Sequence, residues 1–198
     1  MRLWVVLVLA VAVAGCTTQR RTEPQRSATE EMLISSAADR AVGELRFDVK
    51  GKKVFVDATN YKGLDREYTV AAVHERLLRD GAMLVGDRKN ADAVVEMRNG
   101  AQSIDQRNFL IGIPSFDLPI PLAGAFKFPE IALYRRAVDI GVSKLTVAGF
   151  DAKTGAYLGS SEPVYGFAHD KNYRVMIFFG WNRQDFRPNQ EPTSAGAP

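Results

Sequence analysis

Apolar and polar positions along the chain change their spacing several times, and each spacing predicts a kind of element. From Ser27 to about Val42 apolar residues recur at helical spacing, and Ser27 with a glutamate three positions later forms a capping box, so we expect a helix. Residues 52–60 are rich in β-branched and aromatic side chains and predict a strand. A second helical pattern follows Asp65, a residue type that suits a helix N-cap, and ends at Gly81.

The remaining pattern predicts extended structure. Two strands are expected at 82–87 and 91–105, and a strand, a helix and a strand within about 35 residues should place the first two strands side by side and parallel. Residues 134–150 then alternate, and the turn at 151–155 leads into 156–167, which predicts a long antiparallel hairpin. The fold class expected is α/β (α+β): a single domain, with a mixed sheet, two helices and a long antiparallel hairpin.

One largely apolar segment, residues 108–134, fits neither spacing. Its prolines, at positions Pro114, Pro119, Pro121 and Pro129, exclude a regular helix or a central strand through its middle. A long apolar loop is costly to expose, and its backbone groups are hard to satisfy when it is buried. We therefore expect either a partner surface or a loop folded over its own core. The candidate partner-surface residues are Phe109, Ile111, Phe116, Leu118, Leu122, Phe126 and Phe128.

The first residues predict export. Residues 1–15 combine a positive start at Arg2, an uncharged apolar run and small residues before Cys16, which is the pattern of a signal peptide. The apolar run would span roughly 18 Å as a helix, well short of the ~30 Å core of a bilayer. It is therefore too short for a transmembrane helix.

The end of this run, Val13-Ala14-Gly15-Cys16, resembles the lipobox of bacterial lipoproteins. The resemblance implies that the thiol of Cys16 carries diacylglycerol, that the chain is cut before it, and that the new amino terminus is acylated. In well-studied lipoproteins of Gram-negative bacteria, an aspartate after the cysteine tends to retain the protein at the inner membrane, and here Thr17 follows. The resemblance thus implies the outer membrane, with the domain facing the periplasm; the inner membrane and the cell surface are the alternatives.

Composition and charge argue against a disulfide and against a nucleic-acid partner. The chain has 198 residues and one cysteine, so lipidation would leave no thiol for a disulfide. Its net charge of +3 is too small to indicate a nucleic-acid partner. We assign residues 16–28 to the lipidated cysteine and a flexible tether, 29–182 to a globular domain, and 183–198 to a disordered tail.

The segment 52–105 resembles a β-α-β-β module shared by several outer-membrane lipoproteins. In it a strand with the sequence VFVDATN leads to a helix that ends at Gly81, then to a strand, an Ala-Asp pair and a long strand. TraT-like surface-exclusion lipoproteins and curli-secretion lipoproteins have comparable modules, and FDAKTG at 150–155 resembles a hairpin turn in relatives of the latter. An uncharacterised lipoprotein family, a domain of unknown function, is similar over most of residues 30–180. The resemblance implies work by assembly and supplies no catalytic residue.

A few polar residues are candidates for chemistry. His74 lies on the apolar side of the second helix, where it is either a general base or a half-buried histidine, and no nucleophile motif accompanies it. His169 and Asp170 lack the paired spacing of zinc ligands and are expected in a solvated loop. Asp57 and Asp92 stand beside strands, where turn and capping roles are expected. We therefore predict no enzyme activity, no cofactor and no metal.

The function expected is that of a membrane-anchored periplasmic lipoprotein, a noncatalytic scaffold or assembly factor of the cell envelope. Its expected partners are membrane lipid, through acylated Cys16, and envelope proteins; a homo-oligomer remains open, and nucleic acid is not expected. The first alternative is a subunit of a ring-forming outer-membrane export complex, which would place residues 108–134 in or on the membrane. The second is an envelope hydrolase, which would need a nucleophile and a base to converge around His74.

Overall fold

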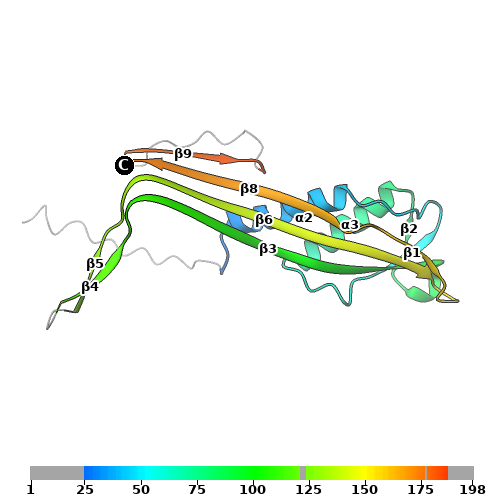
Figure 1. The fold of residues 1–198 in the computed structure, drawn as a ribbon. Helices are drawn as coiled ribbons and strands as arrows, with labels where there is room; N and C mark the ends of the chain where they lie inside the picture. The colour runs from blue at the N-terminus through cyan, green and yellow to red at the C-terminus, as the bar shows by residue number, and fades with distance from the viewer. Residues whose placement is uncertain (1–24, 121–123, 177, 187–198) are drawn as a thin grey trace, which may run out of the picture.

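A computed structural model describes residues 25–120, 124–176 and 178–186, which form a single α+β domain with two helices and a mixed, strongly curled sheet (Figure 1). The helices are α2 (Ala28–Gly43) and α3 (Arg66–Arg79), with a short 3-10 turn at Arg88–Asn90. The main sheet contains β1 (Lys53–Asp57), β2 (Met83–Leu84), β3 (Ala93–Ile113), β6 (Ile131–Asp151), β7 (Tyr157–Ser160), β8 (Val164–Val175) and β9 (Phe179–Gln184). A separate two-stranded ribbon contains β4 (Phe116–Ile120) and β5 (Gly124–Phe128). The expected fold class is confirmed.

The order of strands in the main sheet is β2-β1-β3-β6-β8-β9, with β7 beside β6. β1 is parallel to both β2 and β3, which confirms that the first two strands are parallel neighbours. β6 and β8 pair antiparallel from Tyr134↔Val175 to Leu145↔Val164, which confirms the long hairpin. Local periodicity therefore identified these pairings correctly.

The segment 108–134 differs from the expected loop, because it is built of strands. β3 and β6 are each 21 residues long and pair from Ala93↔Asp151 to Ile113↔Ile131, and the β4–β5 ribbon continues beyond them. The prolines do not prevent this. Both strands of a two-stranded ribbon are edge strands, where Pro119 is tolerated, and Pro114 and Pro129 fall between strands. Pro121 lies outside the described residues.

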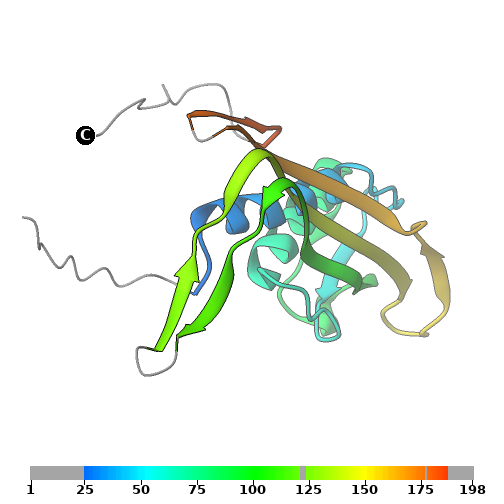
Figure 2. The same ribbon diagram turned by 60° about the vertical axis from the view of Figure 1, so that its left-hand side comes forward.

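The helices cover one face of the sheet near β1, whereas the other end of β3, β6, β8 and β9 extends beyond them (Figures 1 and 2). The capping box of α2 is confirmed: the Ser27 side chain accepts from the Glu30 amide, and the Glu30 side chain accepts from the Ser27 amide. α2 contacts β8 and β6, and α3 packs with α2. The main core lies between these helices and the near half of the sheet, with Val73 and Leu77 of α3 fully buried.

α3 begins at the expected place, but Asp65 does not cap it as expected. The backbone of Asp65 is left-handed, with φ of 50°, and its side chain makes no capping hydrogen bond. Its carboxylate instead accepts two hydrogen bonds from Arg26, at 2.5 and 3.1 Å, and so ties the loop before α3 to the start of α2. The helix ends as expected, because Gly81 has a φ of 91° that favours glycine.

The ordered domain is slightly longer than the expected 29–182. β9 includes Arg183 and Gln184, and Phe186 packs against the small cluster of Leu33, Ala37 and Ala168, so the expected tail does not begin at 183. The predicted signal peptide, Cys16 and most of the predicted tether lie outside the described residues.

Candidate functional site

The ribbon and the strand ends that carry it, residues 108–120 and 124–134, form an arm that projects from the end of the sheet (Figures 1 and 2). Five of the predicted partner-surface residues on this arm are between 43% and 55% exposed: Phe109, Ile111, Phe116, Leu118 and Phe126. Phe128 is partly buried and stacks on Phe116, with ring centroids 5.0 Å apart. Leu122 lies outside the described residues. In the described part of the chain, therefore, the arm is not folded over the core of its own domain.

Four of these side chains lie on one side of the ribbon. Phe116 pairs with Phe128, and Leu118 pairs with Phe126, so alternation along the two strands puts all four on the same face. A two-stranded ribbon has little stability of its own in water. An exposed apolar face on such an element is typical of a surface that another molecule covers.

A comparison with known families adds to this geometry. The model of the DUF6655 family, a family of unknown function, matches residues 10–181. The chain belongs to the DUF6655 family. No curated protein matches the sequence. The matched residues include the main sheet from β1 to the first residues of β9, and the whole arm. These elements therefore lie within the region that the family model covers.

His169 of this DUF6655 protein lies within β8 and not in a solvated loop as expected. It is half-buried; its amide donates to Asp185 Oδ1 at 2.8 Å, and its Nδ1 lies 3.0 Å from Asp185 Oδ2. Arg40 of α2 donates to the same carboxylate at 3.2 Å and to the Asp185 carbonyl at 2.7 Å. Burial acts to raise the pKa of Asp185, but the hydrogen bonds from His169 and Arg40 outweigh it and hold that pKa below its usual value. This cluster joins the end of β9 to β8 and α2, which is a structural role.

The other candidates for chemistry lie apart from one another. His74 is half-buried on α3, which agrees with its interpretation as a half-buried histidine, and burial lowers its pKa. Asp57 accepts from the Thr59 amide at 3.0 Å, which is the expected turn role. Asp92 instead accepts from the Lys53 amide at 3.0 Å and links the residue before β3 to the start of β1. The described part of the chain holds no cluster of three or more His, Cys, Asp or Glu side chains arranged for a metal ion.

Neither α2 nor α3 is both long enough and apolar enough to cross a membrane, and this holds for every helix in residues 25–120, 124–176 and 178–186. Three aromatic residues of β8 and β9 are not among the predicted site residues: Tyr173, which is partly buried, and Phe179 and Trp181, which are exposed. Alternating basic and aromatic residues in these two strands were a detectable signal. Their position relative to β3 cannot be read from the sequence of this DUF6655 protein, because it depends on the pairing of four strands.

Proposed function

We propose that this protein is a membrane-anchored periplasmic lipoprotein that acts as a noncatalytic scaffold or assembly factor of the cell envelope. The arm is the observation that carries the proposal. Its apolar side chains lie on a projecting element, away from the core, where a partner protein can reach them. Burial of one large apolar side chain contributes roughly 1.5–3 kcal/mol, so a partner that covers several of them gains enough for a stable contact.

The anchor in this proposal is Cys16, through the VAGC resemblance to a lipobox. Two or three acyl chains hold a protein firmly on a membrane, whereas one gives only reversible binding. Thr17 favours the outer membrane, and the domain would then face the periplasm close to the lipid surface. A scaffold in this position binds envelope proteins without leaving the membrane.

The experiment that tests the proposal is cross-linking in intact cells followed by mass spectrometry, with Phe116→Asp compared to the unchanged protein. A charge placed in an apolar interface costs several kcal/mol, so the variant should lose its partner cross-links. Ser115→Asp is the matched control, because it adds the same charge at the neighbouring exposed residue. Both variants should keep the melting temperature of the domain, since neither site is in the core.

Two results would count against the arm as a partner surface. Retained cross-links in Phe116→Asp would show that the apolar face is not the contact. A large fall in its melting temperature would show that the arm packs on its own domain.

The first alternative, a ring-forming export subunit, is favoured by a separate observation. In the described residues β1 pairs with β3 only from Ala93 to Glu96, so the rest of that edge of β3 has no strand beside it, and β9 is the opposite edge of the sheet. β3 and β9 run in opposite directions, so β9 of one copy can extend β3 of the next as an antiparallel pair. Light scattering of the purified protein in detergent tests this: a ring requires one discrete mass of several chains, and a monomer contradicts it.

A further inference from the structure

The projecting end of the sheet has one face that is rich in cations. Gly141 of β6 contacts Leu33 of α2, so residues of opposite parity on β6 point away from the helices. On that side, three neighbouring cross-strand rows of β3, β6, β8 and β9 form what we call the outer distal face. Its basic side chains are Arg107, Arg136, Lys171 and Arg183.

Within these three rows the cations have no carboxylate beside them. The three rows contain no aspartate or glutamate, and none of the four basic side chains is in an ion pair within the described residues. In the next row on this side Asp105 pairs with Ile140, and on the opposite face Asp139 pairs in register with Asp170. The outer distal face is therefore complementary to an extended negative surface.

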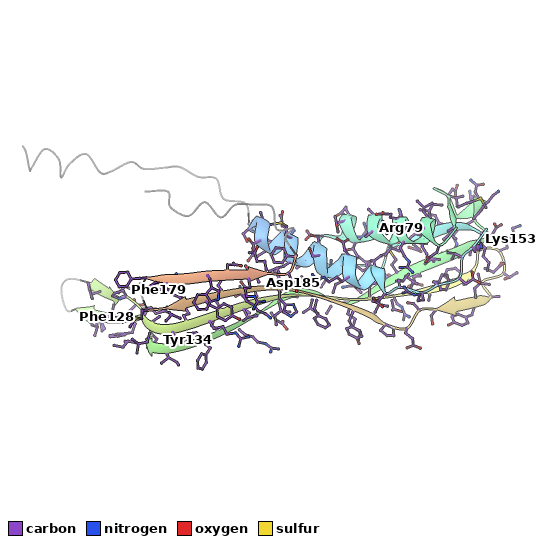
Figure 3. All side chains as sticks on the ribbon, turned by 90° about the horizontal axis from the view of Figure 1, so that it is seen from above. Arg79, Phe128, Tyr134, Lys153, Phe179 and Asp185 are labelled. Carbon is purple, nitrogen blue, oxygen red and sulfur yellow. The ribbon has the colours of Figure 1, made fainter. Side chains whose placement is uncertain are left out.

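Aromatic side chains lie among the cations. Tyr173 stacks on Trp181 with centroids 5.3 Å apart, and the Arg136 guanidinium lies 5.8 Å from the Tyr173 ring. Phe109 and Tyr134 form a second ring pair at 6.2 Å. Trp181 is 49% exposed. Tryptophan and tyrosine are the side chains that favour the headgroup level of a bilayer. Figure 3 shows Tyr134 at this end of the sheet, beyond the helices, and Lys153 at the other end.

The face also has a hollow of about 320 Å³. Arg107, Arg136 and Lys171 line it together with Val138 and Ile140. Val138 is only 7% exposed, although no described helix covers this side, so it lies at the bottom of the hollow. Basic side chains around the hollow can bind a phosphate group, and its apolar floor can contact the hydrocarbon that is attached to that phosphate.

The start of the described chain lies at the same end of the domain. Gln25 and Arg26 line a second hollow together with Ser103 to Arg107 of β3. Gln25 is nine positions after Cys16, and a fully extended chain over nine positions spans at most about 30 Å. An anchor at Cys16 would therefore hold this end of the sheet near the lipid surface.

We propose that the outer distal face lies on an anionic phospholipid surface, with Arg107, Arg136, Lys171 and Arg183 on lipid phosphates and the rings at headgroup level. This extends the proposed function, and its argument about orientation rests on the proposed anchor. The acyl chains anchor the protein, and the face orients it so that the β4–β5 ribbon of the arm is presented to a partner. The binding itself requires no acyl chain. It can therefore be tested without the anchor.

The test uses residues 17–198, because every described contact lies within 25–186 and is retained. Trp181 is then the only tryptophan, since the other is Trp4. Flotation with phosphatidylcholine vesicles that contain phosphatidylglycerol should recover the protein, and the Trp181 emission should shift to shorter wavelength. Vesicles of phosphatidylcholine alone should do neither, and raised salt should release the protein.

Two double variants provide the matched comparison. Arg136→Gln with Lys171→Gln removes two charges from the outer distal face, and should lower partitioning to the anionic vesicles by roughly 25-fold. Arg135→Gln with Arg174→Gln removes two charges from the adjacent positions on the same strands, which face the other way. This control should lower partitioning by less than about threefold, because screening weakens charges on the far side of the sheet. Circular dichroism confirms that both variants are folded.

Several outcomes would overturn the proposal. They are equal binding to the two kinds of vesicle, an unchanged Trp181 emission, or equal losses in the two double variants. Binding of single-stranded nucleic acid with the same variant dependence, in the absence of vesicle binding, would assign the face to a different partner. Because no acyl chain is involved, any of these results leaves the lipid anchor and the partner surface of the arm untouched.

Discussion

Replacement of Gly166 by alanine tests whether α2 rests directly on the backbone of the sheet. A methyl group at Gly166 would overlap the carbonyl oxygen of Ala37 and lie 2.6 Å from the backbone nitrogen of Ala41. Both atoms belong to the α2 backbone, so no flexible side chain can move aside. The helix itself must shift away from β8.

The size of the effect follows from this geometry. Overpacking in a close-packed interior costs about 1–3 kcal/mol, and a clash with helix backbone belongs at the upper end of that range. A shift of α2 also loosens the buried cluster of Leu33, Ala37 and Ala168. We expect a loss of about 3 kcal/mol, which for a domain of this size lowers the melting temperature by about 6–12 °C.

Thermal unfolding followed by circular dichroism measures the loss, with Gly180→Ala as the control. Gly180 is also a strand glycine, but the nearest atom to its added methyl group is the Tyr173 carbonyl oxygen at 3.5 Å, an ordinary contact. That variant should unfold at the same temperature as the unchanged protein or slightly higher. If Gly166→Ala stays within about 2 °C of the unchanged protein, α2 does not lie against β8 as described.

Three further outcomes are expected. Cys16→Ser should abolish fatty-acid labelling and release the protein from the membrane or leave it unprocessed, because buried acyl chains provide the anchor; unchanged labelling would refute lipidation. For His74, whose pKa is lowered by burial from 6.5, stability should fall as the pH drops from 6.5 toward the lowered pKa, since the unfolded chain binds the proton first. His74→Gln should remove that slope in urea unfolding and change stability by no more than ~2 kcal/mol, and an unchanged slope would contradict this. Asp185, whose pKa is lowered from 3.8, contributes stability above 3.8 that is lost as the pH falls through the lowered pKa. Asp185→Asn should therefore cost about 1 kcal/mol at pH 7, after allowance for screening by solvent, and nothing in strong acid; an equal cost at both pH values would disprove the linkage.

The sequence alone determined the elements whose causes are local. The capping box at Ser27, the helical spacing before Gly81 and the β-branched run of β1 each depend on neighbours within one or two turns, so the pattern and the structure agree. The parallel pairing of β1 and β2 followed because a short crossover leaves few alternatives. Likewise, composition alone is enough to identify residues 108–134 as unusually apolar.

The extent of the strands was decided by tertiary structure. Beyond the helices no described residue outside the sheet covers its faces, so the alternation that marks a half-buried strand is weak there and does not predict strands in residues 108–134. The effect of the prolines also depends on tertiary structure. Whether Pro119 is compatible with a strand depends on whether that strand is an edge, and edge position is a property of the assembled sheet.

Long-range pairing also decided the individual polar contacts and the outer distal face. Asp65 has the residue type of an N-cap, yet its carboxylate binds Arg26, which only the packing of α2 beside α3 brings within reach. Arg107, Arg136, Lys171 and Arg183 are far apart in the chain and become neighbours through the register of four antiparallel strands. Periodicity shows which side of a strand a residue occupies but not which residue lies opposite, because a shift in register changes every partner while it leaves the sequence pattern the same.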